Sequence, residues 1–92
     1  MSETGRRWSI IILRRPEKVL KRLPRELGDR LRLAIRSLAC NPRSGDVEEL
    51  KSRKNLYRLR VGDWRIVFAI YDDRLVVVVV EVVPRGGAYR RR

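Results

Sequence analysis

Two kinds of hydrophobic periodicity divide the chain. Residues 8–13, WSIIIL, are rich in aromatic and β-branched side chains, which predicts a short buried strand. The stretch PEKVLKRL from Pro16 fits one or two helical turns, because proline and an acidic residue are favoured at a helix N-terminus. Beyond Pro24, hydrophobic residues recur at steps of three and four, which predicts an amphipathic helix of about 16 residues ended by Asn41 and Pro42. Its hydrophobic positions are Leu27, Leu31, Ala34, Ile35 and Leu38.

The second half of the chain has the two-residue alternation of strands. LYRLRV at 56–61 and WRIVFAIY at 64–71 are separated by Gly62 and Asp63, which predicts a two-residue hairpin turn with glycine at the first central position. After a second turn comes LVVVVVEVV at 75–83. This run is apolar on both faces, so we expect it in the interior of the sheet.

Between the two halves, residues 43–55 are polar and loop-like, with VEEL at 47–50 as a candidate edge strand. The elements predict an α+β fold in a single domain over residues 1–92. Its order is an N-terminal strand, a two-helix hairpin and an antiparallel meander of three to four strands, with the helices packed on one face of the sheet. The other face stays partly open and is the expected place for a site.

Charge points to a polyanionic partner. Lys and Arg number 23 against 11 Asp and Glu, a net charge of +12, and nineteen of the basic residues are arginine. A field of this size favours nucleic acid first, an acidic protein second and a membrane surface third. The planar fork of arginine matches phosphate oxygens and stacks on bases, although a GC-rich genome or adaptation to heat also enriches this residue.

Several classes of function are disfavoured by what the sequence lacks. Cys40 is the only cysteine, so an intramolecular disulfide is excluded, and we expect its thiol to be buried rather than reactive. There is no histidine, which argues against a zinc site and an imidazole base; we expect no metal and no cofactor. No apolar run approaches the ~20 residues that span a bilayer, and the start MSETGRRWSIIIL lacks a signal-peptide cleavage pattern, so we expect a cytoplasmic protein without membrane contact.

Three arginines fall where packing alone would not put them. Arg58 and Arg60 are two apart on a predicted strand and therefore share a face, and hairpin pairing brings Arg65 close to them. Like charges side by side weaken a sheet, which suggests that an anion binds there. The alternative is a solvated basic face.

The stretch after the last strand adds a second group. Arg85 follows Pro84, and Gly86 and Gly87 let the backbone bend sharply, so that Tyr89 can turn back toward the sheet. Arg85 and Tyr89 would then converge on the face of the three arginines. The alternative is a frayed terminal segment.

Residues 56–90, LYRLRVGDWRIVFAIYDDRLVVVVVEVVPRGGAYR, resemble the RelE superfamily of toxin–antitoxin systems, and more closely its archaeal members. The shared theme is a basic strand, a Gly-Asp turn, an aromatic-Arg pair, a hydrophobic strand, and an Arg and a Tyr near the end. The upstream strand and helical hairpin fit the family's order, so the resemblance covers nearly the whole chain.

The resemblance implies a ribosome-dependent mRNA interferase, a metal-independent endoribonuclease that cuts the codon in the ribosomal A site with the RNA's own 2′-OH as nucleophile. Arg65 and Arg85 would clamp the scissile phosphate, and Tyr89 would stack on a base or take part in proton transfer. Arg58 and Arg60 stand where a bacterial pattern has lysines. Arginine is a poor proton donor, so the general base is open, with Tyr89 as one candidate.

The resemblance also implies partners: the ribosome and mRNA, and a cognate RelB-like antitoxin, acidic or amphipathic, in a heterodimer or heterotetramer. Further basic residues are expected to grip the RNA backbone, namely Lys51, Arg53, Lys54, Arg90, Arg91 and Arg92. Arginines on the predicted second helix are expected to be solvated, namely Arg30, Arg32 and Arg36.

Two other functions stay open at this point. ParE-like toxins share the fold and poison DNA gyrase, without the full set of Arg and Tyr residues. A non-catalytic basic nucleic-acid-binding module would need only arginines and an aromatic ring such as Trp64, Tyr57 or Tyr89 to stack on bases. Against this, we expect Trp8, Trp64 and Phe68 to be core side chains.

Overall fold

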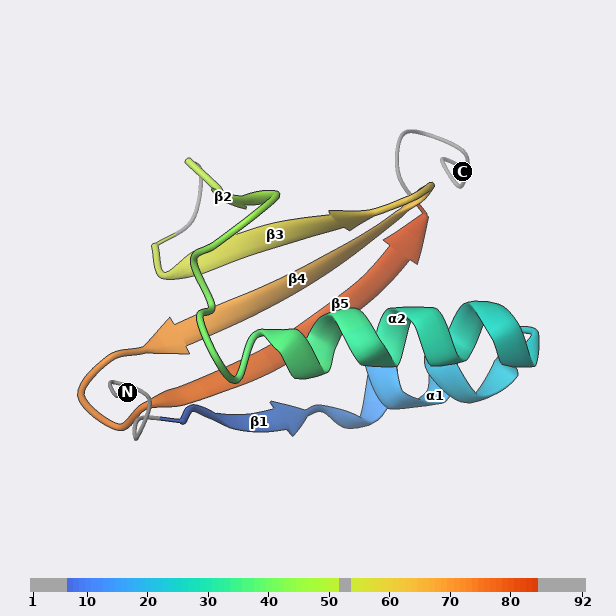
Figure 1. Cartoon of the computed structure of the whole chain (residues 1–92), viewed down its shortest axis with the longest axis horizontal. Coiled ribbons are helices and arrows are strands. Elements are labelled where there is room, and N and C mark those ends of the chain that lie inside the picture. The colour runs from blue at the N-terminus through green and yellow to red at the C-terminus, as the bar shows by residue number, and fades with distance from the viewer. Residues whose placement is uncertain (1–6, 52–53, 85–92) are drawn as a thin grey trace.

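A mixed five-stranded sheet carries two helices on one of its faces (Figure 1). The computed structural model describes residues 7–51 and 54–84. The elements are β1 (Ser9–Ile12), α1 (Arg14–Arg22), α2 (Arg25–Ser37), β2 (Val47–Glu49), β3 (Leu56–Val61), β4 (Trp64–Tyr71) and β5 (Val76–Pro84). The α+β order predicted from the sequence is confirmed.

The strands lie in the order β1-β5-β4-β3-β2. Neighbours from β2 to β5 pair antiparallel, which confirms the meander and the short edge strand predicted at VEEL. β1 pairs parallel with β5, with Ser9 opposite Val76 and Ile12 opposite Val79. β5 therefore lies inside the sheet, as expected for a strand that is apolar on both faces.

Prolines set the ends of the helical hairpin. α1 begins at Arg14, so Pro16 falls within its first turn, where a missing N–H costs no hydrogen bond. The helix ends at Arg22 because Leu23 precedes Pro24 and takes an extended conformation, with φ −76° and ψ 156°. α2 restarts directly after Pro24. Neither helix is long and apolar enough to cross a membrane, within the part of the chain that the structure describes.

α2 is shorter than its periodicity predicts, and this overturns the expectation for Cys40. The helix has 13 residues and ends at Ser37; a short turn follows, and the carbonyl of Ala39 accepts a hydrogen bond of 2.9 Å from the N–H of Trp8. Cys40 is the last residue of this turn and is exposed rather than buried. The prediction took Cys40 to lie near the end of the helix and to be buried, whereas α2 ends three residues earlier, at Ser37.

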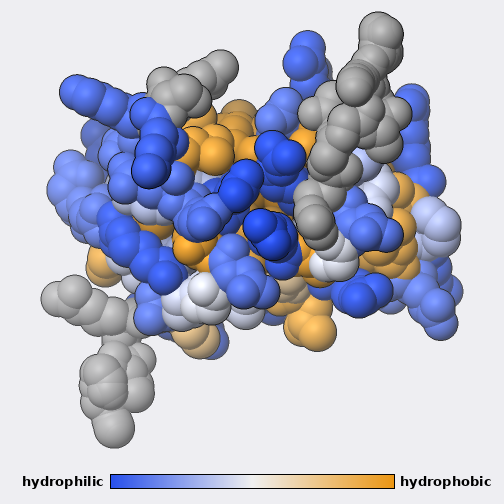
Figure 2. Space-filling view, turned by 90° about the horizontal axis from the view of Figure 1, so that it is seen from above, coloured by the Kyte–Doolittle hydropathy of each residue, from blue (hydrophilic) through white to orange (hydrophobic). Residues whose placement is uncertain are grey.

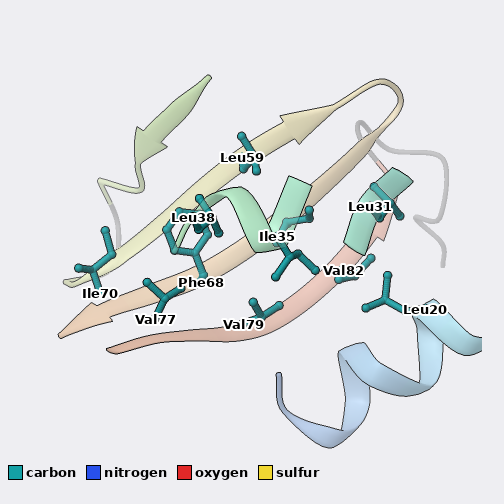
Figure 3. Packing of buried hydrophobic residues seen from close by; sticks show 11 residues of the cluster. Leu20, Leu31, Ile35, Leu38, Leu59, Phe68, Ile70, Val77, Val79 and Val82 are labelled. Atoms are coloured by element: carbon teal, nitrogen blue, oxygen red, sulfur yellow. The ribbon is translucent and has the colours of Figure 1, made fainter. Parts of the chain in front are cut away.

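The core lies between α2 and the middle strands (Figure 3). Leu31 and Ile35 of α2, and Leu38 directly after it, are directed toward the sheet, where Phe68 of β4 is fully buried. Each of these side chains is at most 2% exposed, and burying one is worth roughly 1.5–3 kcal/mol. Leu20 adds the contribution of α1. Trp8 and Trp64 pack against this cluster while partly exposed, so all three aromatic residues expected in the core contribute to it.

A bulge in β5 decides which side chains enter this core. Phe68 pairs with Val79 and Val67 pairs with Glu81, so Val80 is an extra residue in the ladder. Strict alternation would place Val79 and Glu81 on the same face. The bulge instead turns Val82 toward the helices, where it is 3% exposed, and leaves Glu81 exposed on the opposite face.

Two tight turns shape the strand ends. Gly62 has φ 59° at the first central position of the β3–β4 hairpin, as predicted, and Asp63 does not share this left-handed conformation. Leu75 has φ 55°, which a residue with a branched side chain rarely adopts. β5 therefore begins at Val76, one residue later than the run of hydrophobic residues suggests.

Two ion pairs join segments that are distant in sequence. Both guanidinium nitrogens of Arg32 donate to Glu17, at 2.8 and 3.3 Å, and thereby fasten α2 to α1. The expectation that Arg32 would be merely solvated is thus wrong. Arg43, after α2, donates two bonds of 2.9 Å to Asp72 in the β4–β5 turn and lies over the Tyr57 ring at 5.4 Å from its centroid.

The Glu17–Arg32 pair gives a pH-dependent stability prediction. Its hydrogen bond from Arg32 holds the pKa of the Glu17 carboxyl below its usual value. The stabilisation is therefore fully present above the pKa of an unfolded Glu, about 4.3, and is lost as pH falls through the lower folded-state value. Glu17→Gln should reduce the free energy of unfolding by about 0.5–1 kcal/mol at pH 7, and the difference should vanish in acid. Urea unfolding at a series of pH values measures it.

Glu26→Gln is the matched control. Glu26 also lies in the first turn of its helix, so its removal causes the same loss of interaction with the helix dipole, but no arginine bridges it to the other helix. If the two variants lost equal stability at pH 7, the bond to Arg32 would contribute nothing.

Candidate functional site

Three arginines gather on the face of the sheet that the helices leave uncovered. Arg60 and Arg65 are direct cross-strand partners, and Arg58 lies two residues further along β3 on the same face. Side chains paired in this way have Cβ atoms about 4.5–5.5 Å apart. The intervening residues, Leu59 and Ile66, point the other way into the core. The prediction that these arginines share one face is confirmed.

Arg65 is partly enclosed by its neighbours. Its side chain is half-buried, and its Nε is shielded from solvent without a hydrogen-bond acceptor among the residues that the structure describes. A shielded donor without a partner costs free energy. Arg60 is exposed beside it. Neither guanidinium forms an ion pair with a carboxylate of residues 7–51 and 54–84.

Glu48 of β2 is the acidic member of the site. It lies directly opposite Arg58, and its Oε1 accepts a hydrogen bond from Nη2 of Arg58. This bond lowers the pKa of the Glu48 carboxyl below its usual value, and the charges of Arg58, Arg60 and Lys51 act in the same direction. Sequence reasoning missed Glu48. The alternation of VEEL was visible, but the register that sets Glu48 against Arg58 spans a loop.

Two surface hollows adjoin Glu48. One is lined by Gly45, Asp46, Val47, Glu48 and Arg60, and the other by Glu48, Glu49, Leu50, Lys51 and Arg58. Lys51 thus borders the arginine face, and Lys54 is exposed in the same loop. Figure 2 looks onto the edge of the sheet formed by β2 and shows mostly hydrophilic side chains, with hydrophobic ones between them.

The remaining predicted site residues lie outside the described part of the chain, namely Arg53, Arg85, Tyr89, Arg90, Arg91 and Arg92. Pro84, the last residue of β5, is opposite Trp64, and Val83 is opposite Arg65. The strand that precedes Arg85 in sequence therefore ends at the corner where Arg60 and Arg65 lie.

Tyr57 and Trp64 are not available on the arginine face. Both pack against the core on the helix-covered side, and the Tyr57 ring stacks on Phe68 with centroids 6.0 Å apart. These two rings therefore cannot stack on the bases of an RNA bound to the arginines, as one form of the non-catalytic nucleic-acid-binding alternative requires. In the described ranges no three His, Cys, Asp or Glu side chains come together to hold a metal ion. What this face offers is a cluster of guanidinium donors suited to phosphate oxygens.

Comparison with known proteins assigns the chain to a family. The sequence profile described as "ParE toxin of type II toxin-antitoxin system, parDE" matches residues 10–89. The RelE1 protein of Methanocaldococcus jannaschii is 28% identical over 87 residues, which cover 91% of this chain and 97% of that protein.

Solved structures agree with the profile. The archaeal RelE–RelB complex from Pyrococcus horikoshii OT3 contains a chain with TM-score 0.77 and 27% identity, covering 88% of this chain and 98% of that one. The RelBE complex of E. coli gives TM-score 0.74 at 18% identity, over 86% of this chain and 98% of that one, which shows the fold alone. The profile spans most of the sequence and the fold agrees over the same region, so the chain belongs to the RelE/ParE family of toxins of type II toxin–antitoxin systems.

Proposed function

We propose that the protein is a ribosome-dependent mRNA endonuclease that cuts A-site codons through attack of the RNA 2′-OH on the adjacent phosphate. The observation that carries the proposal is the placement of Arg58, Arg60 and Arg65 close together on the uncovered face of the sheet. Similarity to proteins named RelE over nearly the whole chain supports the same reading.

The chemistry assigned to this cluster is stabilisation of negative charge. A phosphodiester that enters the corner near Arg65 meets Arg60 directly across the ladder and Arg58 further along the face. The pentacoordinate phosphate carries more charge on its oxygens than the ground state, so donors held in place on strands favour it selectively. Arg85 and Tyr89 would complete the site, since Pro84 ends β5 at the same corner.

An antitoxin partner is part of the proposal. The similar chain from P. horikoshii was solved in a RelE–RelB complex. We infer a RelB-like antitoxin of acidic or amphipathic character, bound in a heterodimer or heterotetramer in the cytoplasm. The charge of +12 favours fast electrostatic capture of such a partner.

Arg65 is the sharpest test of the catalytic face. Arg65→Ala should lower the single-turnover cleavage rate on programmed ribosomes by about 100- to 1,000-fold, the effect of removing one well-placed donor. Arg65→Lys should recover only part of the rate, because lysine keeps the charge and loses the fork. Arg74→Ala is the matched control, since Arg74 is an exposed arginine beyond the other end of β4. Equal rates for the two alanine variants would remove Arg65 from the site.

Arg85 and Tyr89 are tested in the same assay. Arg85→Ala should slow cleavage by about 100-fold if its guanidinium contacts the scissile phosphate. Tyr89→Phe separates the two roles considered for the tyrosine, because phenylalanine stacks on a base but cannot transfer a proton. A slow Tyr89→Phe variant indicates proton transfer, and a normal rate indicates stacking. Unchanged rates in both Arg85→Ala and Tyr89→Ala, which removes the ring as well as the hydroxyl, would exclude this segment from catalysis.

A gyrase poison is the second candidate, favoured by the ParE description of the matching profile. Cell-free translation with a defined message distinguishes the two. An endonuclease should stop protein synthesis and shorten the message, whereas a gyrase poison should leave both unaffected and block supercoiling of plasmid DNA. Intact message and normal synthesis would contradict the proposal.

A further inference from the structure

Glu48 forms an ion pair with Arg58, one of the three arginines of the open face. It is the middle residue of β2, directly across from Arg58, and it accepts a hydrogen bond from that guanidinium. Arg60 and Arg65 have no such carboxylate among the described residues. The lowered pKa of Glu48 keeps it ionised near neutral pH, so Arg58 meets a full negative charge from its own chain.

We propose that Glu48 is an internal competitor for RNA phosphate, which holds Arg58 until a polyanion with several phosphates displaces it. The proposal rests on the proposed RNA-binding function of this face. It assigns to β2 a role in setting how strongly, and to which ligands, the face binds.

The competition follows from the chemistry of the two anions. A carboxylate and a phosphodiester each carry one negative charge and each offer two oxygens to the guanidinium fork. They therefore exclude each other at Arg58. The pair is also reversible, because the Glu48 side chain is 65% exposed and that of Arg58 is 27% exposed, and exposed ion pairs are weak.

Reversibility makes the face selective for extended ligands. A lone phosphate at Arg58 would replace one ion pair with another and gain little. An RNA backbone can contact Arg65, Arg60 and Arg58 together, so only one of its contacts has to displace a carboxylate. Glu48 thereby weakens binding to isolated phosphates and short fragments more than binding to a strand held in place over the whole face.

Glu48→Gln is the direct test, with an uncleavable 2′-O-methyl RNA oligonucleotide at low salt as the probe. Binding followed by fluorescence anisotropy should tighten by about two- to fivefold, the range expected for an exposed ion pair. Glu26→Gln is the matched control. It changes the net charge equally, but Glu26 is exposed in the first turn of α2, on the helix-covered side of the sheet, so it should leave affinity nearly unchanged.

A double-mutant cycle separates competition from general charge and from strand stability. In an Arg58→Gln background, Glu48→Gln should no longer tighten binding, because the contested guanidinium is gone. Equal gains from Glu48→Gln and Glu26→Gln, or a gain that persists without Arg58, would mean that only net charge matters. A Glu48→Gln variant that lowers the unfolding temperature without tightening binding would show that the pair serves only to hold β2.

The outcome is independent of the cleavage test. If the wild-type protein cleaves mRNA on programmed ribosomes but Glu48→Gln does not change RNA affinity, the proposed endonuclease function stands and the proposed role of Glu48 is wrong. If Glu48→Gln binds RNA more tightly but the wild-type protein does not cleave, the proposed role of Glu48 stands and the proposed endonuclease function is wrong. Absence of RNA binding in every variant would overturn the competitor as well.

Discussion

The packing of α2 on the middle strands is the interaction on which the rest of the structure depends. Leu31, Ile35 and Leu38 cover the strand residues around Phe68 and exclude water from one face of the sheet. Because a small chain has apolar residues for one core only, the other face of β3 and β4 can carry charge without burying it. No charged residue is buried in the described part of the chain. A face that carries arginines is thus compatible with a stable sheet.

The bulge at Val80 extends this separation of charge from core into β5. It keeps Glu81 outside while Val82 joins the hydrophobic cluster. On the open face a row then runs from Glu48 through Arg58 and Val67 to Glu81. The positive charges are therefore bordered by one carboxylate on the first strand of the row and another on the last, a distribution that net charge alone does not reveal.

Local pattern was sufficient for most elements and for the arginine face. Arg58 and Arg60 are two residues apart on a strand, and a two-residue turn precedes Trp64. This spacing is enough to predict from the sequence that Arg58, Arg60 and Arg65 lie on the same face of the sheet. Features set by contacts distant in sequence could not be predicted. One such feature is the early end of α2, which leaves Cys40 exposed. The turn that follows the helix accepts a hydrogen bond from the N–H of Trp8 at the carbonyl of Ala39. The Glu17–Arg32 and Glu48–Arg58 pairs likewise depend on how separate elements come together.

The parallel pairing of β1 with β5 has a consequence for how the protein is made. Ser9 finds its partner at Val76, so one border of the sheet stays unfinished until nearly all of the described chain has been synthesised. Contacts this remote in sequence slow folding, since a long loop must close before they form. A nascent copy of this chain therefore lacks its β1–β5 pairing until the last described strand has left the ribosome, so the sheet is completed only at the end of synthesis.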